Sequence, residues 1–359
     1  MNPPSLTGGL TLRLHVRRGT VDEVEIVSTR PQAAVMLAGK TPEQAVRLAP
    51  LLFSLCGGAQ GVAAQAALLA AQGGEPDARQ RAQWAATVRR EAANEHLWHL
   101  MLAWPPLCGL DNLEREYADC RKRLLQAQSD EEHATALAAM TSRLLGMPPG
   151  DWLRLGRTEW DSWHNDSAAL GAVLLRAAGD IAGVPPSLLP PAPAEGWLAL
   201  EQQMRESAFC AAPTWHGEPR ETGALARQRE HALVSSLLEA GRNIEARLVA
   251  RLVELARWAC GETGEARDWV DAARCADGSG LARVETARGV LLHRVCVEHG
   301  LISEYAAVAP TEWNFHPRGA YAREAMLIAA TDDAERKARM LALSLDPCVA
   351  CEVVLEQAD

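Results

Sequence analysis

The sequence lacks a long apolar segment, because no run of 18 uncharged apolar residues occurs in its 359 residues. A helix that crosses a bilayer needs about 20 such residues, so we expect no transmembrane helix. Residues 1–5 have neither a basic stretch nor an apolar core. These absences predict a chain without a signal peptide and a cytoplasmic protein.

A basic surface is also missing. The net charge is −10, and acidic residues and arginines are mixed along the chain. Proteins that bind nucleic acid or anionic membranes usually present a basic stripe. The charge therefore argues against nucleic acid and membrane surfaces as partners.

The cysteines do not suggest a disulfide framework. Nine cysteines, an odd number, are scattered through a large chain. In a reducing compartment this favours free thiols and metal ligands. Six of them lie in apolar or helical surroundings, and we expect these to be small core residues. They are Cys108, Cys120, Cys210, Cys260, Cys275 and Cys296.

The apolar pattern predicts an α+β fold formed by residues 1–359 as a single domain. Alternation over 9–28 indicates a β-hairpin, and residues 281–309 resemble strands joined by turns. The first predicted helix begins at Pro42, and the others cover about 58–72, 77–102, 112–126, 129–145, 224–260 and 332–345. The proline cluster at 184–195 predicts an exposed connection. We expect mainly a helical bundle, with this N-terminal hairpin and a small β-meander in the C-terminal half.

Two cysteine segments carry the strongest chemical signal. Cys348 and Cys351 form a Cys-x-x-Cys pair, and Cys56 precedes two glycines that leave room near the backbone. Thiolates are soft ligands for iron, zinc, nickel or copper. Three alternatives remain open: buried structural thiols, a zinc site and a redox pair. Structural zinc prefers four protein ligands, and a thioredoxin-like motif opens a helix, whereas this pair follows Pro347.

Several segments resemble, in order, those of nickel–iron hydrogenase large subunits and, within that superfamily, the HupK/HoxV-type maturation proteins. They are Arg30 to Pro42 and on to Cys56-Gly57, Glu221 to Arg227, Val284 to Gly289, Pro310 to Asn314, and Asp346 to Cys351. Together they cover nearly the whole chain. The resemblance implies a hydrogenase large-subunit-like fold.

The departures from the catalytic pattern imply that the chain does not split hydrogen. In the catalytic family two Cys-x-x-Cys motifs supply four thiolates to nickel, and two of these sulfurs bridge to iron. Here Ala59 replaces one bridging cysteine, so we expect no nickel. Ala63 and Val354 stand where the family has histidines. Thr7 replaces a glutamate that is thought to relay protons, and threonine does not titrate in the needed range.

The resemblance also implies an iron site. The family's iron is thought to carry two cyanides and one carbon monoxide. Arg288 and Thr311 match the residues that donate hydrogen bonds to the cyanides. Cys351 occupies the surviving bridging position and is the candidate iron ligand, with Cys348 and Cys56 as second ligand or transfer thiol. Transfer by thiolate exchange leads us to expect an accessible cysteine of low pKa.

The histidines and tryptophans give weaker signals. We expect His96 and His99, three residues apart in one helix, to be packing or surface residues. His316 lies beside the Trp-Asn motif and could line the pocket or face a partner. The remaining aromatic residues noted, expected in the core or at an interface, are Trp152, Trp160, Trp163 and Trp215.

Three functions remain possible. The first is a non-catalytic scaffold that holds an Fe(CN)2(CO) unit transiently. Its partners would be a HypC-type small maturation chaperone with its complex and the hydrogenase large subunit. The second is a metal-free interaction protein that recruits maturation factors by mimicry. The third is a diverged nickel–iron oxidoreductase, against which the residues at 59 and 7 argue.

Overall fold

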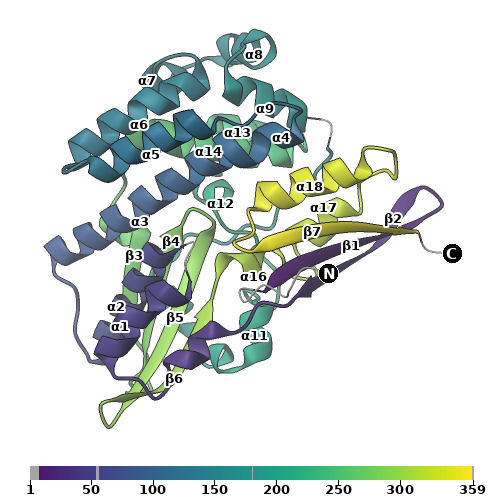
Figure 1. Cartoon of the computed structure of the whole chain (residues 1–359). Helices are drawn as coiled ribbons and strands as arrows, with labels where there is room; N and C mark the ends of the chain where they lie inside the picture. Colours follow the sequence, from purple (N-terminus) through teal and green to yellow (C-terminus); the bar gives the residue numbers. More distant parts are fainter. Residues whose placement is uncertain (1–7, 54–55, 180, 358–359) are drawn as a thin grey trace.

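A computed structural model describes residues 8–53, 56–179 and 181–357. Most of the larger helices gather in one layer with two small sheets beside it, and the two helices over residues 42–71 lie against one of these sheets (Figure 1). The helices of the first half are α1 (Pro42–Leu52), α2 (Gly57–Ala71), α3 (Ala78–Trp98), α4 (Trp104–Leu107), α5 (Glu114–Gln126), α6 (Asp130–Leu145), α7 (Pro149–Trp152), α8 (Arg157–Asp166) and α9 (Leu170–Ala178). Those of the second half are α10 (Ala194–Trp197), α11 (Ser207–Ala211), α12 (Ala224–Gln228), α13 (Ala232–Glu239), α14 (Asn243–Ala259), α15 (Ala266–Trp269), α16 (Pro310–Asn314), α17 (Ala320–Ala325) and α18 (Ala334–Leu345). The predicted α+β class is confirmed.

The predicted N-terminal hairpin is present and gains a strand from the other end of the chain. β1 (Gly9–Arg17) pairs antiparallel with β2 (Thr20–Ser28), and its inward residues are buried at every second position. β7 (Ala350–Gln357) pairs parallel with β1, so that Cys351 lies opposite Leu10. The sequence pattern did not predict β7. This pairing brings the C-terminal cysteine segment to the N-terminal sheet.

The second sheet is the predicted meander with one additional strand. Its order is β3 (Val270–Arg274), β4 (Gly280–Thr286), β5 (Gly289–Glu298) and β6 (Leu301–Val308), all antiparallel. The alanine-rich α2 packs on β4 and β5. A Cβ at Gly280 would lie 1.9 Å from the Ala67 carbonyl oxygen, so this glycine permits the close approach of helix and strand.

Helix α1 begins as the sequence predicts. Thr41 is its N-cap, Pro42 is its first residue, and Gln44 completes a capping box with Thr41. The helix predicted over about 77–102, ending before Pro105, is present as α3, which ends at Trp98. A π-helical segment follows α3, and α4 then includes Pro105 in its first turn, where a backbone N–H is not needed.

Two expectations about other segments are corrected. The single helix expected over 224–260 is three helices, with Gly241 in the left-handed region (φ 69°) between α13 and α14. The proline cluster is an irregular connection but only partly exposed, since Leu189 and Ala194 within it are buried. In the described part of the chain, no helix combines the length and apolarity needed to cross a bilayer.

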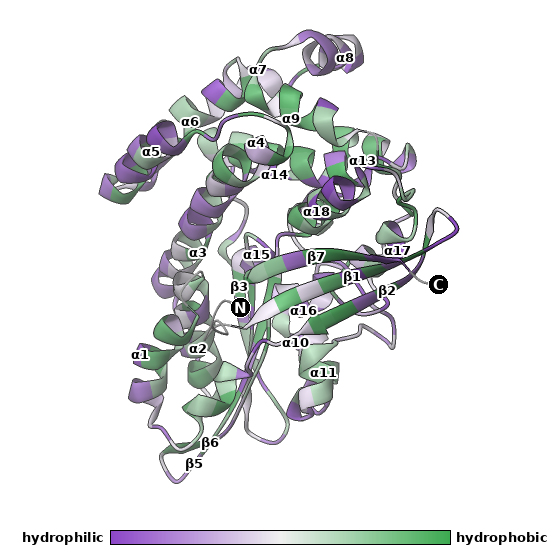
Figure 2. Cartoon of the chain, turned by 45° about the vertical axis from the view of Figure 1, so that its right-hand side comes forward, coloured by the Kyte–Doolittle hydropathy of each residue, from purple (hydrophilic) through white to green (hydrophobic). Residues whose placement is uncertain are grey.

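The helical layer surrounds α14, whose side chains are buried along nearly its whole length. Helices α6, α9, α12, α13 and α18 pack against it. At the edge of this layer, α5 and α8 are largely hydrophilic (Figure 2). The charged residues of α14 form buried ion pairs, including Arg247 with Glu221 at 2.7 Å and with Glu324 at 2.6 Å.

Candidate functional site

The fold brings Cys56 and Cys348 together from opposite ends of the chain. Cys56 immediately precedes α2, and Cys348 lies in the turn between α18 and β7. Burial, together with the neighbouring Cys348 sulfur, raises the pKa of Cys56 to about 12. Gln60, one turn into α2, places its Nε2 3.6 Å from Cys56 Sγ. The two thiols therefore lie near each other and are partly buried, and Gln60 offers an N–H to Cys56.

Thr311 fixes the position of Cys348. It lies in the first turn of α16, and its hydroxyl donates to Cys348 Sγ at 3.0 Å. The same oxygen accepts a hydrogen bond from the Cys348 backbone N–H at 3.3 Å. A hydroxyl predicted to line the site thus lies directly against one of the predicted thiols.

Arg288 lies beside the pair in the turn between β4 and β5. Its Nη2 is 2.9 Å from Glu95 Oε2, and its Nε is 3.2 Å from Asp346 Oδ1. Burial opposes its charge, but the carboxylates and both thiols hold its pKa above the ordinary arginine value. Arg288 is thus a buried cation facing Cys56 and Cys348.

The sequence reasoning assigned no role to a second arginine at the pair. Arg30, just after β2, forms an ion pair with Glu312 of α16. Burial opposes the charge of Arg30, yet Glu312, Cys348 and Cys56 raise its pKa. The sequence feature that could have identified Arg30 is its position at the start of the segment that resembles the hydrogenase family. Glu95 was also missed, because its partner Arg288 lies 193 residues away in the sequence.

Cys351 has different surroundings. It lies in β7 beside β1, and burial raises its pKa to about 12. Burial also raises the pKa of Tyr321, and the nearby Cys351 sulfur adds to that rise. Within the described ranges, no three histidine, cysteine or acidic side chains are grouped to hold a metal ion. Iron ligation by Cys351 therefore stays a prediction. The expectation of a low cysteine pKa is wrong for Cys56 and Cys351, because both thiols are desolvated.

Two of the residues that depart from the catalytic pattern are packed inside the protein. Ala59 and Ala63 are fully buried in α2. The Ala59 N–H donates to Glu91 Oε1 at 3.1 Å, and the Gly58 N–H donates to Glu91 Oε2 at 2.7 Å. A carboxylate thus caps the helix where the family has a second cysteine. Thr7 lies outside the described residues.

The histidines and most tryptophans pack as expected. His96 Nε2 is 2.8 Å from Glu254 Oε2, and His99 Nε2 is 2.7 Å from the Leu343 carbonyl oxygen. His316 is buried, and its Nδ1 accepts from the Arg318 N–H at 3.0 Å. Trp152, Trp160 and Trp163 form a buried cluster, and Trp215 packs on Trp197. Of the six cysteines expected in the core, Cys260 is exposed and Cys108 and Cys296 are partly buried.

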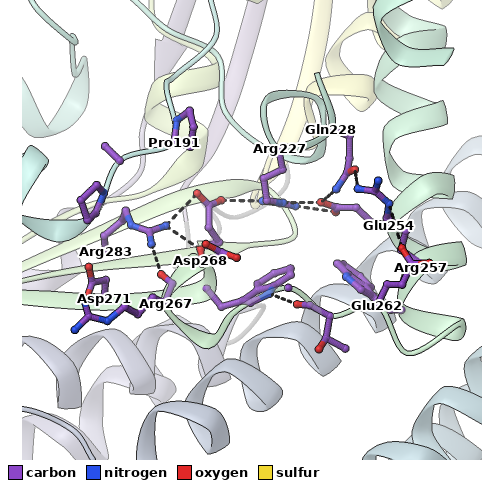
Figure 3. A pocket seen from close by; sticks show the side chains of 17 residues that line it. Pro191, Arg227, Gln228, Glu254, Arg257, Glu262, Arg267, Asp268, Asp271 and Arg283 are labelled. Atoms are coloured by element: carbon purple, nitrogen blue, oxygen red, sulfur yellow. Dashed lines mark hydrogen bonds and ion pairs between the residues drawn. The ribbon is translucent and has the colours of Figure 1, made fainter. Parts of the chain in front are cut away.

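A large cavity lies away from the thiols. It has a volume of about 490 Å³ and lies between α14, α15 and β4 (Figure 3). Arg227 spans its wall, with Nη2 2.9 Å from Glu254 Oε2 and Nη1 2.9 Å from Glu285 Oε2. Arg227 pairs with Glu254 and Glu285, Arg283 also pairs with Glu285, and no cysteine lines the cavity. We therefore take Cys56 and Cys348 as the candidate site.

Comparison with known proteins defines the class. The family described as nickel-dependent hydrogenase matches residues 239–354. The NiFeSe hydrogenase of D. vulgaris Hildenborough superposes with a TM-score of 0.61 at 16% identity, over 93% of this chain and 95% of that chain. The NiFeSe hydrogenase of Dm. baculatum gives 0.59 at 15% identity, over 94% and 96%. The fold is therefore that of a nickel-dependent hydrogenase large subunit.

The sequence relatives are more specific. The hydrogenase expression/formation protein HoxV of Cupriavidus necator is 34% identical over 95% of this chain and 94% of its own length. The corresponding protein HupK of Azotobacter vinelandii is 32% identical over 98% of this chain and its full length. The chain belongs to the HupK/HoxV family of hydrogenase expression/formation proteins.

Proposed function

We propose that the chain is a non-catalytic scaffold that holds the Fe(CN)2(CO) unit of a nickel–iron active site and delivers it to the hydrogenase large subunit. The observation that carries this proposal is the placement of Cys56 and Cys348 together, with Arg288 and Thr311 beside them. The names of the relatives, which are expression/formation proteins, support a role in maturation.

The chemistry of these groups suits the cargo. Thiolates are good ligands for low-valent iron, and a cyanide nitrogen accepts charge-assisted hydrogen bonds. Arg288 would supply a guanidinium donor and Thr311 a hydroxyl donor. Cys351 would become an iron ligand through a shift of the turn at 348–351, with Cys348 and Cys56 as second ligand or transfer thiol. Ala59 leaves too few sulfurs for a nickel site, so nickel is not part of the cargo.

Delivery implies two partners. A HypC-type small maturation chaperone and its complex would bring the iron unit, and the hydrogenase large subunit would receive it, in the cytoplasm. A site with fewer sulfurs than the catalytic one makes fewer bonds to iron. Transfer by thiolate exchange is therefore easier from this chain than from a finished active site.

The test is infrared spectroscopy on protein purified anaerobically from cells that express the maturation system. We expect cyanide and carbonyl stretches and bound iron without nickel. Cys351→Ser, Cys348→Ser and Cys56→Ser should each reduce the signals, with the first of these abolishing them. Cys260→Ser, at an exposed cysteine, is the matched control and should leave them intact.

Other outcomes would favour the alternatives. Normal hydrogenase maturation in cells that carry Cys348→Ser and Cys351→Ser would support a metal-free interaction protein. Bound nickel and hydrogen-dependent reduction of an electron acceptor would support a diverged oxidoreductase.

A further inference from the structure

The Arg30–Glu312 ion pair is an unusual feature of the site. Arg30 leads out of β2 and Glu312 lies in α16, so the pair joins two elements that are far apart in sequence. Their side chains are 14% and 18% exposed. One Glu312 oxygen pairs with Arg30, while Glu312 Oε2 is buried and has no hydrogen-bond partner among the described residues. Such a carboxylate binds its arginine through only one of its two oxygens, so it makes fewer hydrogen bonds than it could.

The ion pair lies in the neighbourhood of both thiols. Cys348 and Cys56 each raise the pKa of Arg30, as they raise the pKa of Arg288. Glu312 directly follows Thr311, whose hydroxyl contacts Cys348 Sγ. The two thiols therefore have two guanidinium groups as neighbours, one from the β2 side and one from the β4–β5 turn.

A cavity leads from the surface to this ion pair. It has a volume of about 260 Å³, and Arg30, Glu312 and Gln60 line it. Gln60 also contacts Cys56 Sγ. Val35, another lining residue, is 59% exposed. A small group that enters here would meet Arg30, Glu312 and the Gln60 side chain, which in turn contacts Cys56 Sγ.

We infer that Arg30 is a second anion-binding residue of the site and that Glu312 is the counter-ion that holds it until cargo arrives. The inference rests on the proposed function. It adds a second residue that balances the negative charge of the iron unit. An iron(II) unit with two cyanides and two thiolates is doubly anionic. One guanidinium cannot balance this charge in a desolvated pocket, whereas two can. Arg288 is held by two carboxylates and Arg30 by one, so Arg30 is released more readily.

The first test needs no iron and uses two alkylating reagents of similar size. The metal-free protein is treated with anionic iodoacetate or neutral iodoacetamide at one fixed pH, and modification of Cys348 and Cys56 is followed by mass spectrometry. The ratio of the two rates reports the cationic character around the thiols and cancels changes in the thiolate fraction. Arg30→Met should lower the iodoacetate preference several-fold, and Glu312→Gln should raise it.

Changes of opposite sign in the rate ratio of the two variants distinguish anion binding from a structural ion pair. A merely structural pair would change the ratio in the same direction in both variants, or in neither, and either result would overturn the inference. Arg30→Lys should keep part of the preference. Arg13→Met, which breaks the exposed pair with Glu25 on the same hairpin, is the control and should leave the ratio unchanged.

The second test uses the loaded protein. Arg30→Met should lower the iron content and shift the cyanide stretches, whereas Glu312→Gln should retain iron at least as well as the unaltered chain. Cyanide stretches that disappear in Cys348→Ser but are the same in Arg30→Met would overturn this inference and leave the scaffold proposal standing. Absence of the stretches from the unaltered chain would overturn the scaffold proposal, and the alkylation ratio would still decide the role of Arg30.

Discussion

Thr311 contacts Cys348 at two atoms, with its hydroxyl donating to the sulfur at 3.0 Å and accepting from the backbone N–H at 3.3 Å. One hydroxyl thus fixes both the direction of the thiol and the path of the turn that carries it. The contact links α16 with the segment before β7, two elements that have no direct connection in the chain.

Thr311→Val should weaken the site without unfolding the protein. The replacement keeps the shape but removes the donor and the acceptor, and the loss of such bonds costs about 1–3 kcal/mol. We expect reduced iron content and a shifted cyanide stretch, measured by metal analysis and infrared spectroscopy. Thr311→Ser keeps the hydroxyl and is the matched control. Equal iron content and identical spectra in all three proteins would exclude a role for Thr311.

The stability of the protein should fall in mild acid. Burial lowers the pKa values of His99 and His293 to about 3, so both stay neutral in the folded chain. The unfolded chain takes up protons on these residues below pH of about 6.5, so stability is complete above that value and declines as pH falls toward 3. Each histidine should cost about 2 kcal/mol between pH 7 and pH 5.

Urea unfolding at the two pH values measures this decline. His293 contacts Tyr305 Oη and Gln60 Oε1, both at 2.8 Å. His293→Gln removes one titrating group, so its free energy of unfolding should depend less steeply on pH. A variant that loses as much stability as the unaltered chain would show that His293 is not a neutral buried residue.

Glu254 should be essential for the stability of the helical layer. Burial alone would raise the pKa of Glu254, but Arg227 and His96 hold it far below the usual range. Glu254→Gln leaves the Arg227 charge buried with reduced compensation, and breaking such a pair costs about 3–5 kcal/mol. Thermal and urea unfolding would measure the loss. Glu25→Gln, at the exposed pair with Arg13, is the control and should not change the midpoint.

The sequence was sufficient to predict those elements whose formation depends on residues close together in the chain. The alternation of buried residues in β1 and the Thr41 cap of α1 are short-range signals, and both are present in the structure. By contrast, β7 has adjacent apolar residues at Val353, Val354 and Leu355 instead of alternation. Its partner β1 lies at the other end of the chain, so no local pattern could identify the pairing.

Some features of the candidate site were predicted from the sequence and others were not. The closeness of Cys56 and Cys348 was expected from the family resemblance, because spacing cannot join residues so far apart. The Arg30–Glu312 pair was not found, since an ion pair between distant segments leaves no periodic signal. The breaks inside 224–260 were missed because Gly241 interrupts an apolar pattern that continues on both sides.

Strand β7 should control the cysteine segment that precedes it. Val353 is buried and lies opposite Leu12, which is also buried. Val353→Asp places an unpaired charge in this interface, which costs on the order of 3 kcal/mol or more, so β7 should detach from β1. Hydrogen exchange of the β1 amides should then accelerate, and alkylation of Cys348 should become faster.

Glu352→Gln changes an exposed residue of the same strand and serves as the control. Faster exchange in β1 with unchanged Cys348 alkylation would mean that Thr311 alone holds the turn. If both change together, the parallel pairing of the chain's two ends is what keeps Cys348 beside Cys56. Positioning of the thiols would then depend on the sheet as much as on the helices that surround it.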